Sequence, residues 1–302
     1  DFRCRGLQEA EGLRSRKGAS LAADVVGQRY RRVGHASFVR ILIEAQFVMT
    51  RASFLFFVCV SATAQTLDLP LTLEETAGVA RKSEPVTAGV PFPKGFLRDV
   101  PRLRLFDGGG KPVPASFRVV NRWWDDASVQ VASIQWVHFD FLADAPANGK
   151  VVYRLRLSDD EAPAPPAALR VETDGDRIRV NTGAASFSVS KSGPFLEAPG
   201  LRDADILLRS DERIYKASQW PATELVVEEQ NPLRVVLKRT GSHGWVDKKD
   251  KALDYVMRII AWAGQPHIRI IYSFVNRQGH RMSDFVRLDG LWLQYKLERA
   301  AE

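Results

Sequence analysis

The sequence predicts an all-β protein of two domains. Short runs of alternating apolar and polar residues begin at Leu67 and recur to the end of the chain, and turn signals such as Asp107-Gly108-Gly109-Gly110 separate many of them. No convincing helical period interrupts this pattern, which is typical of half-buried strands. We therefore expect a β domain over residues 68–157, a proline-rich linker over 158–168 and a second β domain over 169–302.

Residues 49–64 have the layout of a secretory signal peptide. Met49 begins a short cationic start, an apolar run follows over residues 52–60, and the small residues Ala62 and Ala64 precede the expected cleavage site. We expect export, so that the protein is secreted or periplasmic. The alternative is a buried helix of an ordinary N-terminal domain, since the run is too short for a membrane span of about 20 residues.

Residues 1–48 contain eight arginines without a clean amphipathic period. Because nothing normally precedes a signal peptide, we interpret this segment as non-native upstream sequence, joined to the chain by a misplaced start. The alternative is a disordered basic arm that binds nucleic acid.

The charge balance changes once the first 64 residues are set aside. The chain has a formal net charge of +7, but these residues hold ten of its Lys and Arg and five of its Asp and Glu, which leaves 33 basic against 31 acidic residues. That balance lacks the excess of cations that nucleic-acid binding needs, so we expect no nucleic-acid partner. Both cysteines, Cys4 and Cys59, fall in the same segment. We therefore expect stabilisation by burial rather than by disulfides, and no membrane span after the signal.

The first domain begins with a strand, because residues 67–73 alternate apolar and polar side chains. The prolines and glycines of residues 85–95 predict an extended loop, since proline removes hydrogen-bond donors from a sheet. Beyond the loop, residues 102–105 begin a hairpin that turns at glycines 108–110 and returns over 113–119.

The strand expected over residues 134–141 offers the best binding surface of this domain. Alternation directs one set of side chains toward the core and places Trp136, His138 and Asp140 together on the other face. An indole beside an imidazole and a carboxylate suits the stacking and hydrogen bonding of a sugar. The alternative is that Trp136 packs under a neighbouring loop while His138 bonds to the backbone. Trp124 is a further carbohydrate-binding candidate.

Three segments of this domain resemble a known family. They are EPVTAGVPFPKG (84–95), RLRLFDGGGKPVPASFRVVNRW (102–123) and SIQWVHFDF (133–141). Together they resemble the N-terminal barrel-like domain of the exo-rhamnogalacturonan lyase (PcRGLX/YetA-like) family over about residues 70–157, which implies a RIFT-like β-barrel. The chain departs from the family pattern after Trp124, where it has Asp126-Ala127 and an insertion, so we expect residues 125–131 to be looped out.

The second domain is predicted as a β-sandwich, because many short strands follow one another at short spacing. The expected strands span residues 169–172, 177–181, 186–190, 206–208, 225–227, 234–239, 254–262, 267–275 and 292–297. YVMRIIAWAGQPHIRIIYSFVN resembles the paired long strands of carbohydrate-active supersandwich domains. Since family members are longer and have a helical toroid domain, the resemblance implies a truncated sandwich and a missing C-terminal domain of the same protein as its partner. We expect poor solubility of this chain alone.

Candidate residues for sugar contact in the second domain lie in two predicted loops. A lyase acting on uronic-acid polysaccharides, as the resemblance implies, needs a base and a cation that neutralises the sugar carboxylate. His243 and Trp245 in TGSHGW, and Arg277 and His280 in VNRQGHR, could serve such a site. The alternative is that the glycines mark ordinary hairpin turns with exposed side chains. We assign no catalytic residue.

Other function classes lack their motifs in this sequence. It has no phosphate-binding glycine loop, no Gly-x-Ser-x-Gly motif and no His-rich metal spacing. We therefore expect no cofactor and no metal site here, with Ca²⁺ left open for a full-length protein.

Two functions remain open. The first is the non-catalytic β region of a secreted lyase that acts on rhamnogalacturonan or pectin-type polysaccharides and oligosaccharides, supporting a catalytic domain elsewhere. The second is a non-catalytic carbohydrate-binding or structural exported protein, because a fold does not determine a function. A downstream helical toroid would favour the first, and a stop or a cell-wall anchor would favour the second.

Overall fold

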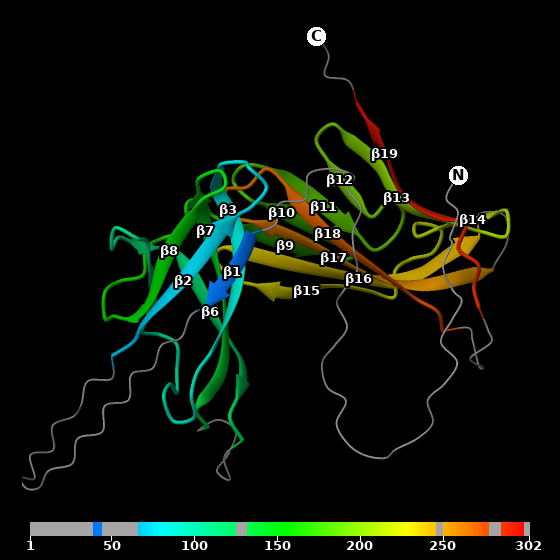
Figure 1. Cartoon of the computed structure of the whole chain (residues 1–302). Helices are drawn as coiled ribbons and strands as arrows, with labels where there is room; N and C mark the ends of the chain where they lie inside the picture. Colours follow the sequence, from blue (N-terminus) through cyan, green and yellow to red (C-terminus); the bar gives the residue numbers. More distant parts are fainter. Residues whose placement is uncertain (1–38, 44–65, 125–131, 246–249, 278–284, 299–302) are drawn as a thin grey trace, which may run out of the picture. The chain divides into compact units, whose positions relative to one another are not determined.

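The computed structural model of the protein describes residues 39–43, 66–124, 132–245, 250–277 and 285–298 (Figure 1). These residues all belong to one compact unit, Phe38–Glu302. Every strand or helix assigned within the described ranges is a β-strand, so the predicted all-β class is confirmed.

Within the described ranges, eight strands lie in the region expected as the first domain and eleven in the region expected as the second, and we keep these names for the two groups of strands. The first eight are β1 (Val39–Ile43), β2 (Asp68–Glu75), β3 (Arg81–Pro91), β4 (Leu103–Phe106), β5 (Pro112–Val113), β6 (Ala115–Arg122), β7 (Ile134–Ala145) and β8 (Lys150–Leu157). The next eleven are β9 (Arg170–Asp174), β10 (Arg177–Asn181), β11 (Ser186–Ser190), β12 (Leu196–Ala198), β13 (Leu201–Ser210), β14 (Arg213–Lys216), β15 (Glu224–Gln230), β16 (Arg234–Trp245), β17 (Lys251–Trp262), β18 (Ile268–Val275) and β19 (Gly290–Leu297).

The first domain consists of two sheets with a common core. One sheet has the order β1-β2-β8-β4-β5 and the other the order β3-β7-β6. Side chains from both sheets, among them Leu73, Leu155, Val137 and Phe139, are at most 1 % exposed and form one apolar cluster. Both sheets are open in this strand order, and the barrel closure implied by the family resemblance remains a prediction.

The extended loop predicted for residues 85–95 is wrong over most of its length, because β3 continues to Pro91. β3 is an edge strand that pairs only with β7. Phe92 donates its N–H to the Gln135 carbonyl. Because the backbone N–H groups of a strand point alternately to its two sides, the even-numbered residues of β3 donate toward β7 and the odd-numbered ones face the open edge. Pro85 and Pro91 both occupy odd-numbered positions. A proline there removes no ladder hydrogen bond, and edge strands tolerate it for this reason.

The predicted glycine-turn hairpin is confirmed, but its returning strand is split. Leu105 pairs with Val113 and Phe106 with Pro112, after which Pro114 ends the pairing with β4. The chain then continues as β6, which pairs with β7 in the other sheet. The hairpin therefore carries the chain from one layer of the first domain to the other.

The second domain is a sandwich made from one continuous sheet. Its strands follow the order β18-β17-β16-β14-β13-β12-β11-β10-β9, with β15 also on β16 and β19 also on β13. Val189 and Ile206, from the half that contains β10–β13, pack in one cluster with Leu237 and Met257 from β16 and β17. The sheet therefore folds over into two facing layers that are joined through β14, and the predicted β-sandwich is confirmed.

All nine strands expected in the second domain are present, and β12 and β14 are additional. β13 and β14 form a hairpin whose turn residues Asp211 and Glu212 have φ values of 46° and 66°. A two-residue hairpin turn requires this left-handed conformation, which Asp tolerates and which is unusual for Glu. Asp211 and Glu212 therefore form the turn of this hairpin.

Several predictions concern residues outside the described ranges. They are the signal peptide over 49–64, the looped-out segment 125–131 and most of the upstream segment 1–48. Within that last segment, β1 pairs antiparallel with β2, with Val39 opposite Glu75 and Ile43 opposite Leu71. The interpretation of 1–48 as non-native upstream sequence stays a prediction.

Apolar side chains lie exposed on β18 and β19. Ile271 and Phe274 are 45 % and 46 % exposed on β18, which is the edge of the sheet, and Leu293 and Leu297 are 48 % and 71 % exposed on β19. Such surfaces favour association. They agree with the expectation of poor solubility, which remains a prediction.

A buried charge network joins the first domain to the sandwich. The Asp140 carboxylate on β7 accepts hydrogen bonds from Thr87 Oγ1 at 2.6 Å and from Asn231 Nδ2 at 2.8 Å. It also lies 3.3 Å from Arg234 Nε, and these two side chains are only 7 % and 11 % exposed. Arg234 is hydrogen-bonded in turn to Glu229. Both domains therefore contribute charged groups to one desolvated site.

Replacing Asp140 with Ala is expected to lower the free energy of unfolding by about 1–3 kcal/mol, because it removes one of the two carboxylates beside the buried Arg234 guanidinium and leaves two neutral donors without their acceptor. Urea unfolding measures this change. The control is Glu228→Ala, which removes a partly exposed ion pair with Arg258 and should cost less than about 1 kcal/mol. The double variant Asp140→Ala/Arg234→Ala should lose less free energy of unfolding than the two single variants lose in sum. An equal loss in Asp140→Ala and in Glu228→Ala would contradict the role of the network.

Candidate functional site

The outer face of β7 carries an exposed aromatic and imidazole pair, which we call the Trp136 platform (Trp136, His138 and the underlying Gly89). Trp136 is 40 % exposed and His138 is partly exposed, while the intervening Val137 faces the core. Gly89 lies opposite His138 on β3. A Cβ at Gly89 would stand 3.0 Å from His138 Cδ2 and 3.6 Å from Trp136 Cε3, so the rings lie over the glycine backbone. A Cβ there would crowd the His138 ring, whereas the indole would remain at an ordinary contact distance.

Polar groups border the Trp136 platform. Arg118 on β6 pairs across the strand with His138, and its guanidinium lies 3.0 Å from Glu229 Oε1. Asn121 lies opposite Trp136 and donates through Nδ2 to Gln135 Oε1 at 2.7 Å. The surface thus combines an apolar ring face with donors and acceptors at its rim, which is the chemistry that a sugar ring requires.

The remaining predicted residues do not join this surface. Trp124 is 88 % exposed at the edge of the described chain, whereas its neighbour Trp123 donates Nε1–H to the Phe92 carbonyl. Trp245 lies at the end of β16 under the Arg213 guanidinium, 4.6 Å from the ring centroid. The exposed Arg277 lies 3.3 Å from Asp254 Oδ2. His280 lies outside the described residues.

The predicted loop position of His243 is wrong. TGSHGW lies within β16, and His243 is fully buried. The glycines that suggested turns have packing reasons instead: a Cβ at Gly241 would stand 2.6 Å from the Tyr255 hydroxyl, and one at Gly244 would collide with the Trp220 ring. His243 therefore has no surface to offer a sugar in this structure.

His243 belongs to a buried polar cluster inside the sandwich. Its Nδ1–H donates to the Leu253 carbonyl at 2.6 Å, which leaves Nε2 to accept a hydrogen bond from the Tyr272 hydroxyl. Tyr272 stacks on Tyr255 with ring centroids 5.7 Å apart, and Tyr255 is hydrogen-bonded to the buried Arg239. Burial lowers the pKa of His243 and raises the pKa of Tyr272. The imidazole of His243 and the phenol of Tyr272 are therefore neutral, and Arg239 is the charged member of the cluster.

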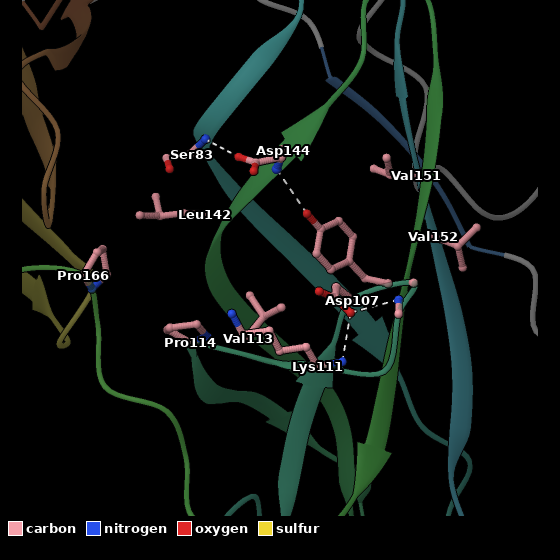
Figure 2. A pocket seen from close by; sticks show the side chains of 13 residues that line it. Ser83, Asp107, Lys111, Val113, Pro114, Leu142, Asp144, Val151, Val152 and Pro166 are labelled. Atoms are coloured by element: carbon pink, nitrogen blue, oxygen red, sulfur yellow. Dashed lines mark hydrogen bonds between the residues drawn. The ribbon is translucent and has the colours of Figure 1, made fainter.

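The structure also contains a cavity that the sequence did not reveal. It has a volume of about 750 Å³ and lies between the β4–β5 turn, β8 and the ends of β3 and β7 (Figure 2). We call it the Asp144 cavity. Its polar lining residues are Ser83, Asp107, Lys111, Asp144 and Tyr153, and its apolar lining residues include Val113, Leu142, Val152 and Pro166.

The described ranges contain neither a metal-binding cluster nor a membrane-spanning helix. No group of three or more His, Cys, Asp or Glu side chains there is arranged to hold a metal ion. No helix of the described residues is long and apolar enough to cross a membrane.

Comparison with known proteins agrees with the sandwich architecture. Residues 169–301 match the family model described as the PcRGLX-like protein central beta sandwich domain. The PcRGLX/YetA-like resemblance is thereby supported. The chain is also similar to the uncharacterized protein YetA of Bacillus subtilis (strain 168), with 24 % identity over 243 residues. That alignment covers 73 % of this chain and 26 % of YetA, so the chain spans about a quarter of its relative's length.

The buried imidazole predicts a pH dependence of stability. Because the pKa of folded His243 is lowered from 6.5 by burial, the unfolded chain binds more protons below pH 6.5. The stability contribution of neutral His243 is complete above pH 6.5 and is lost as the pH falls toward the folded pKa. Urea unfolding between pH 7.5 and pH 5 should therefore show decreasing stability.

A matched pair of variants tests this assignment. His243→Gln should lower the free energy of unfolding at pH 7.5 by about 1–3 kcal/mol, because buried partners lose hydrogen bonds, and should flatten the pH dependence. His267→Gln removes an exposed imidazole and should leave the slope unchanged. An unchanged slope in His243→Gln would contradict the role of this imidazole.

Proposed function

We propose that this chain is a non-catalytic, substrate-positioning β region of an exported lyase that acts on rhamnogalacturonan or related pectin-type polysaccharides. The match to the PcRGLX-like central sandwich domain supports a glycan-active protein, and the signal-like segment 49–64 supports export. The Trp136 platform is the observation that carries sugar contact. Its indole is 40 % exposed beside an imidazole on a rigid central strand.

A positioning role is favoured over a catalytic one by the location of the acid–base groups in the sandwich. His243, Tyr255 and Arg239 are each at most 1 % exposed. A general base must come within hydrogen-bond reach of the proton that it removes, and these groups bond to one another and to the backbone instead. We propose that the catalytic groups lie in other parts of a longer protein, as the length of YetA allows.

Trp136→Ala is expected to weaken the binding of rhamnogalacturonan oligosaccharides about 5- to 30-fold, because truncation of an exposed anchoring indole costs about 1–2 kcal/mol. Isothermal titration calorimetry measures the change in Kd. Trp292→Ala is the matched control, since Trp292 on β19 is 47 % exposed but lies outside the platform. If the unaltered chain, Trp136→Ala and Trp292→Ala had equal Kd values, the assignment of sugar binding to the Trp136 platform would be refuted.

Ultraviolet absorbance during incubation with rhamnogalacturonan tests the non-catalytic assignment. β-Elimination leaves an absorbing unsaturated uronate, so folded protein that binds the polysaccharide should give no rise in absorbance. A rise that Trp136→Ala slows would place the reaction within these domains.

A further inference from the structure

The Asp144 cavity is a built recess rather than an accidental gap in packing. Both sheets of the first domain contribute to its lining, and its volume of about 750 Å³ falls within the range typical of small-molecule sites. We infer that it binds a single neutral sugar unit, which its two carboxylates orient and its apolar wall contacts. This inference rests on the proposed glycan binding and adds a second subsite, which prefers uncharged sugars.

Each carboxylate is fixed by one oxygen and offers the other. Asp144 Oδ1 accepts the Ser83 N–H at 2.6 Å, and Asp107 Oδ1 accepts the N–H groups of Gly109 and Lys111, both at 2.9 Å. Among the described residues, no hydrogen bond to Oδ2 of either carboxylate is present. Ionised carboxylates only accept hydrogen bonds, so the free oxygens select a ligand rich in donors, as a sugar's hydroxyl groups are.

Tyr153 adds a hydroxyl beside Asp144. Its oxygen accepts the Asp144 N–H at 3.1 Å (Figure 2), and the side chain is 6 % exposed. Burial, together with the charges of Asp144 and Asp107, raises the pKa of the Tyr153 phenol. The phenol therefore keeps its proton at neutral pH and can donate it to a ligand oxygen.

The apolar residues complete the recess. In Figure 2, Val113 and Leu142 lie on one side of the cavity and Val151 on the other, and Pro166 lies beyond Leu142. A sugar presents C–H faces as well as hydroxyl groups, so a wall of this kind contacts one part of the ring while the carboxylates bind another.

Charge excludes the acidic alternative. The lining contains two carboxylates and one lysine, the exposed Lys111. A uronate would bring a third carboxylate into this space, and like charges repel strongly where solvent is displaced. The cavity therefore favours the uncharged sugar over its uronate counterpart.

Backbone strain marks the same place. Ser83 has a φ of 51°, which is unusual for a residue other than glycine, and it lies in a β-bulge where the register of β3 against β7 shifts between Arg81 and Glu84. Bulges and strained residues concentrate at functional sites, because they redirect groups that a regular ladder would pair. Here the bulge aims the Ser83 N–H at Asp144.

Two matched glycosides test the inference on the complete chain. Methyl α-D-galactopyranoside and its uronate, methyl α-D-galactopyranosiduronic acid, differ only in the group at C6. Saturation-transfer difference NMR titrations should show binding of the neutral glycoside and at least fivefold weaker binding of the uronate. Asp144→Asn should weaken the binding of the neutral glycoside at least fivefold. It should also reduce the difference in affinity between the two glycosides.

Controls separate the cavity from the Trp136 platform. Asp174→Asn, at an exposed carboxylate on β9, should change neither titration, and Trp136→Ala should retain the preference for the neutral glycoside. Circular dichroism verifies that each variant is folded.

Three results would overturn the inference: no binding of the neutral glycoside, equal binding of both glycosides, or unchanged binding in folded Asp144→Asn. If the oligosaccharide binding that depends on Trp136 persists in that case, only the cavity assignment fails. If it is also missing, the proposed function fails as well.

Discussion

The Asp140 carboxylate holds the first domain against the sandwich, and the surfaces of β7 depend on it. Its two oxygens are bound by Thr87 and Asn231, and Arg234 supplies the compensating charge. Since side chains alternate along a strand, Asp140 shares its face with Trp136 and His138 in one direction and with Leu142 and Asp144 in the other. The middle of β7 therefore contacts the sandwich, while Trp136 toward one end of the strand and Asp144 toward the other remain exposed.

The sandwich has an unusually polar interior for a domain built from one folded sheet. Arg239 is 1 % exposed, and its guanidinium is satisfied by the carbonyls of Ser190 and Lys191 and by the Tyr255 hydroxyl rather than by a carboxylate. A buried cation without an opposite charge is costly unless every donor is bonded. Gly241 makes this arrangement possible, because its missing Cβ leaves space for the Tyr255 hydroxyl. The cluster thus ties β16 and β17 to the opposite layer through the end of β11.

Period-two alternation predicted most of the fold, because a strand with one buried face displays that face in the sequence. The exact bounds of β10 and β11 follow from this pattern. It failed at β3, where prolines suggested a loop, because the sequence does not show that the strand lies at an edge with its proline positions turned outward. It failed again at Gly241 and Gly244, where the need for glycine came from Tyr255 and Trp220, residues distant in sequence.

The candidate site divides in the same way. The shared face of Trp136 and His138 is a local property of one strand and was predictable, whereas the Asp144 cavity gathers Asp107, Asp144 and Tyr153 from three strands and turns. No sequence spacing predicts that these three residues lie close together. A β-bulge likewise leaves no reliable mark in a sequence, so the position of Ser83 could only be seen in the fold.

Ser83 links the Asp144 cavity to the turn between β17 and β18. Its N–H is bound by Asp144, while its carbonyl accepts a hydrogen bond from Gln265 Nε2 at 2.9 Å, and Gln265 in turn accepts one from Thr182 Oγ1 through its own carbonyl. The group that orients Asp144 is thus anchored in the turn between β17 and β18. A displacement of that turn would therefore move the Ser83 backbone, and with it the group that fixes Asp144 at the edge of the cavity.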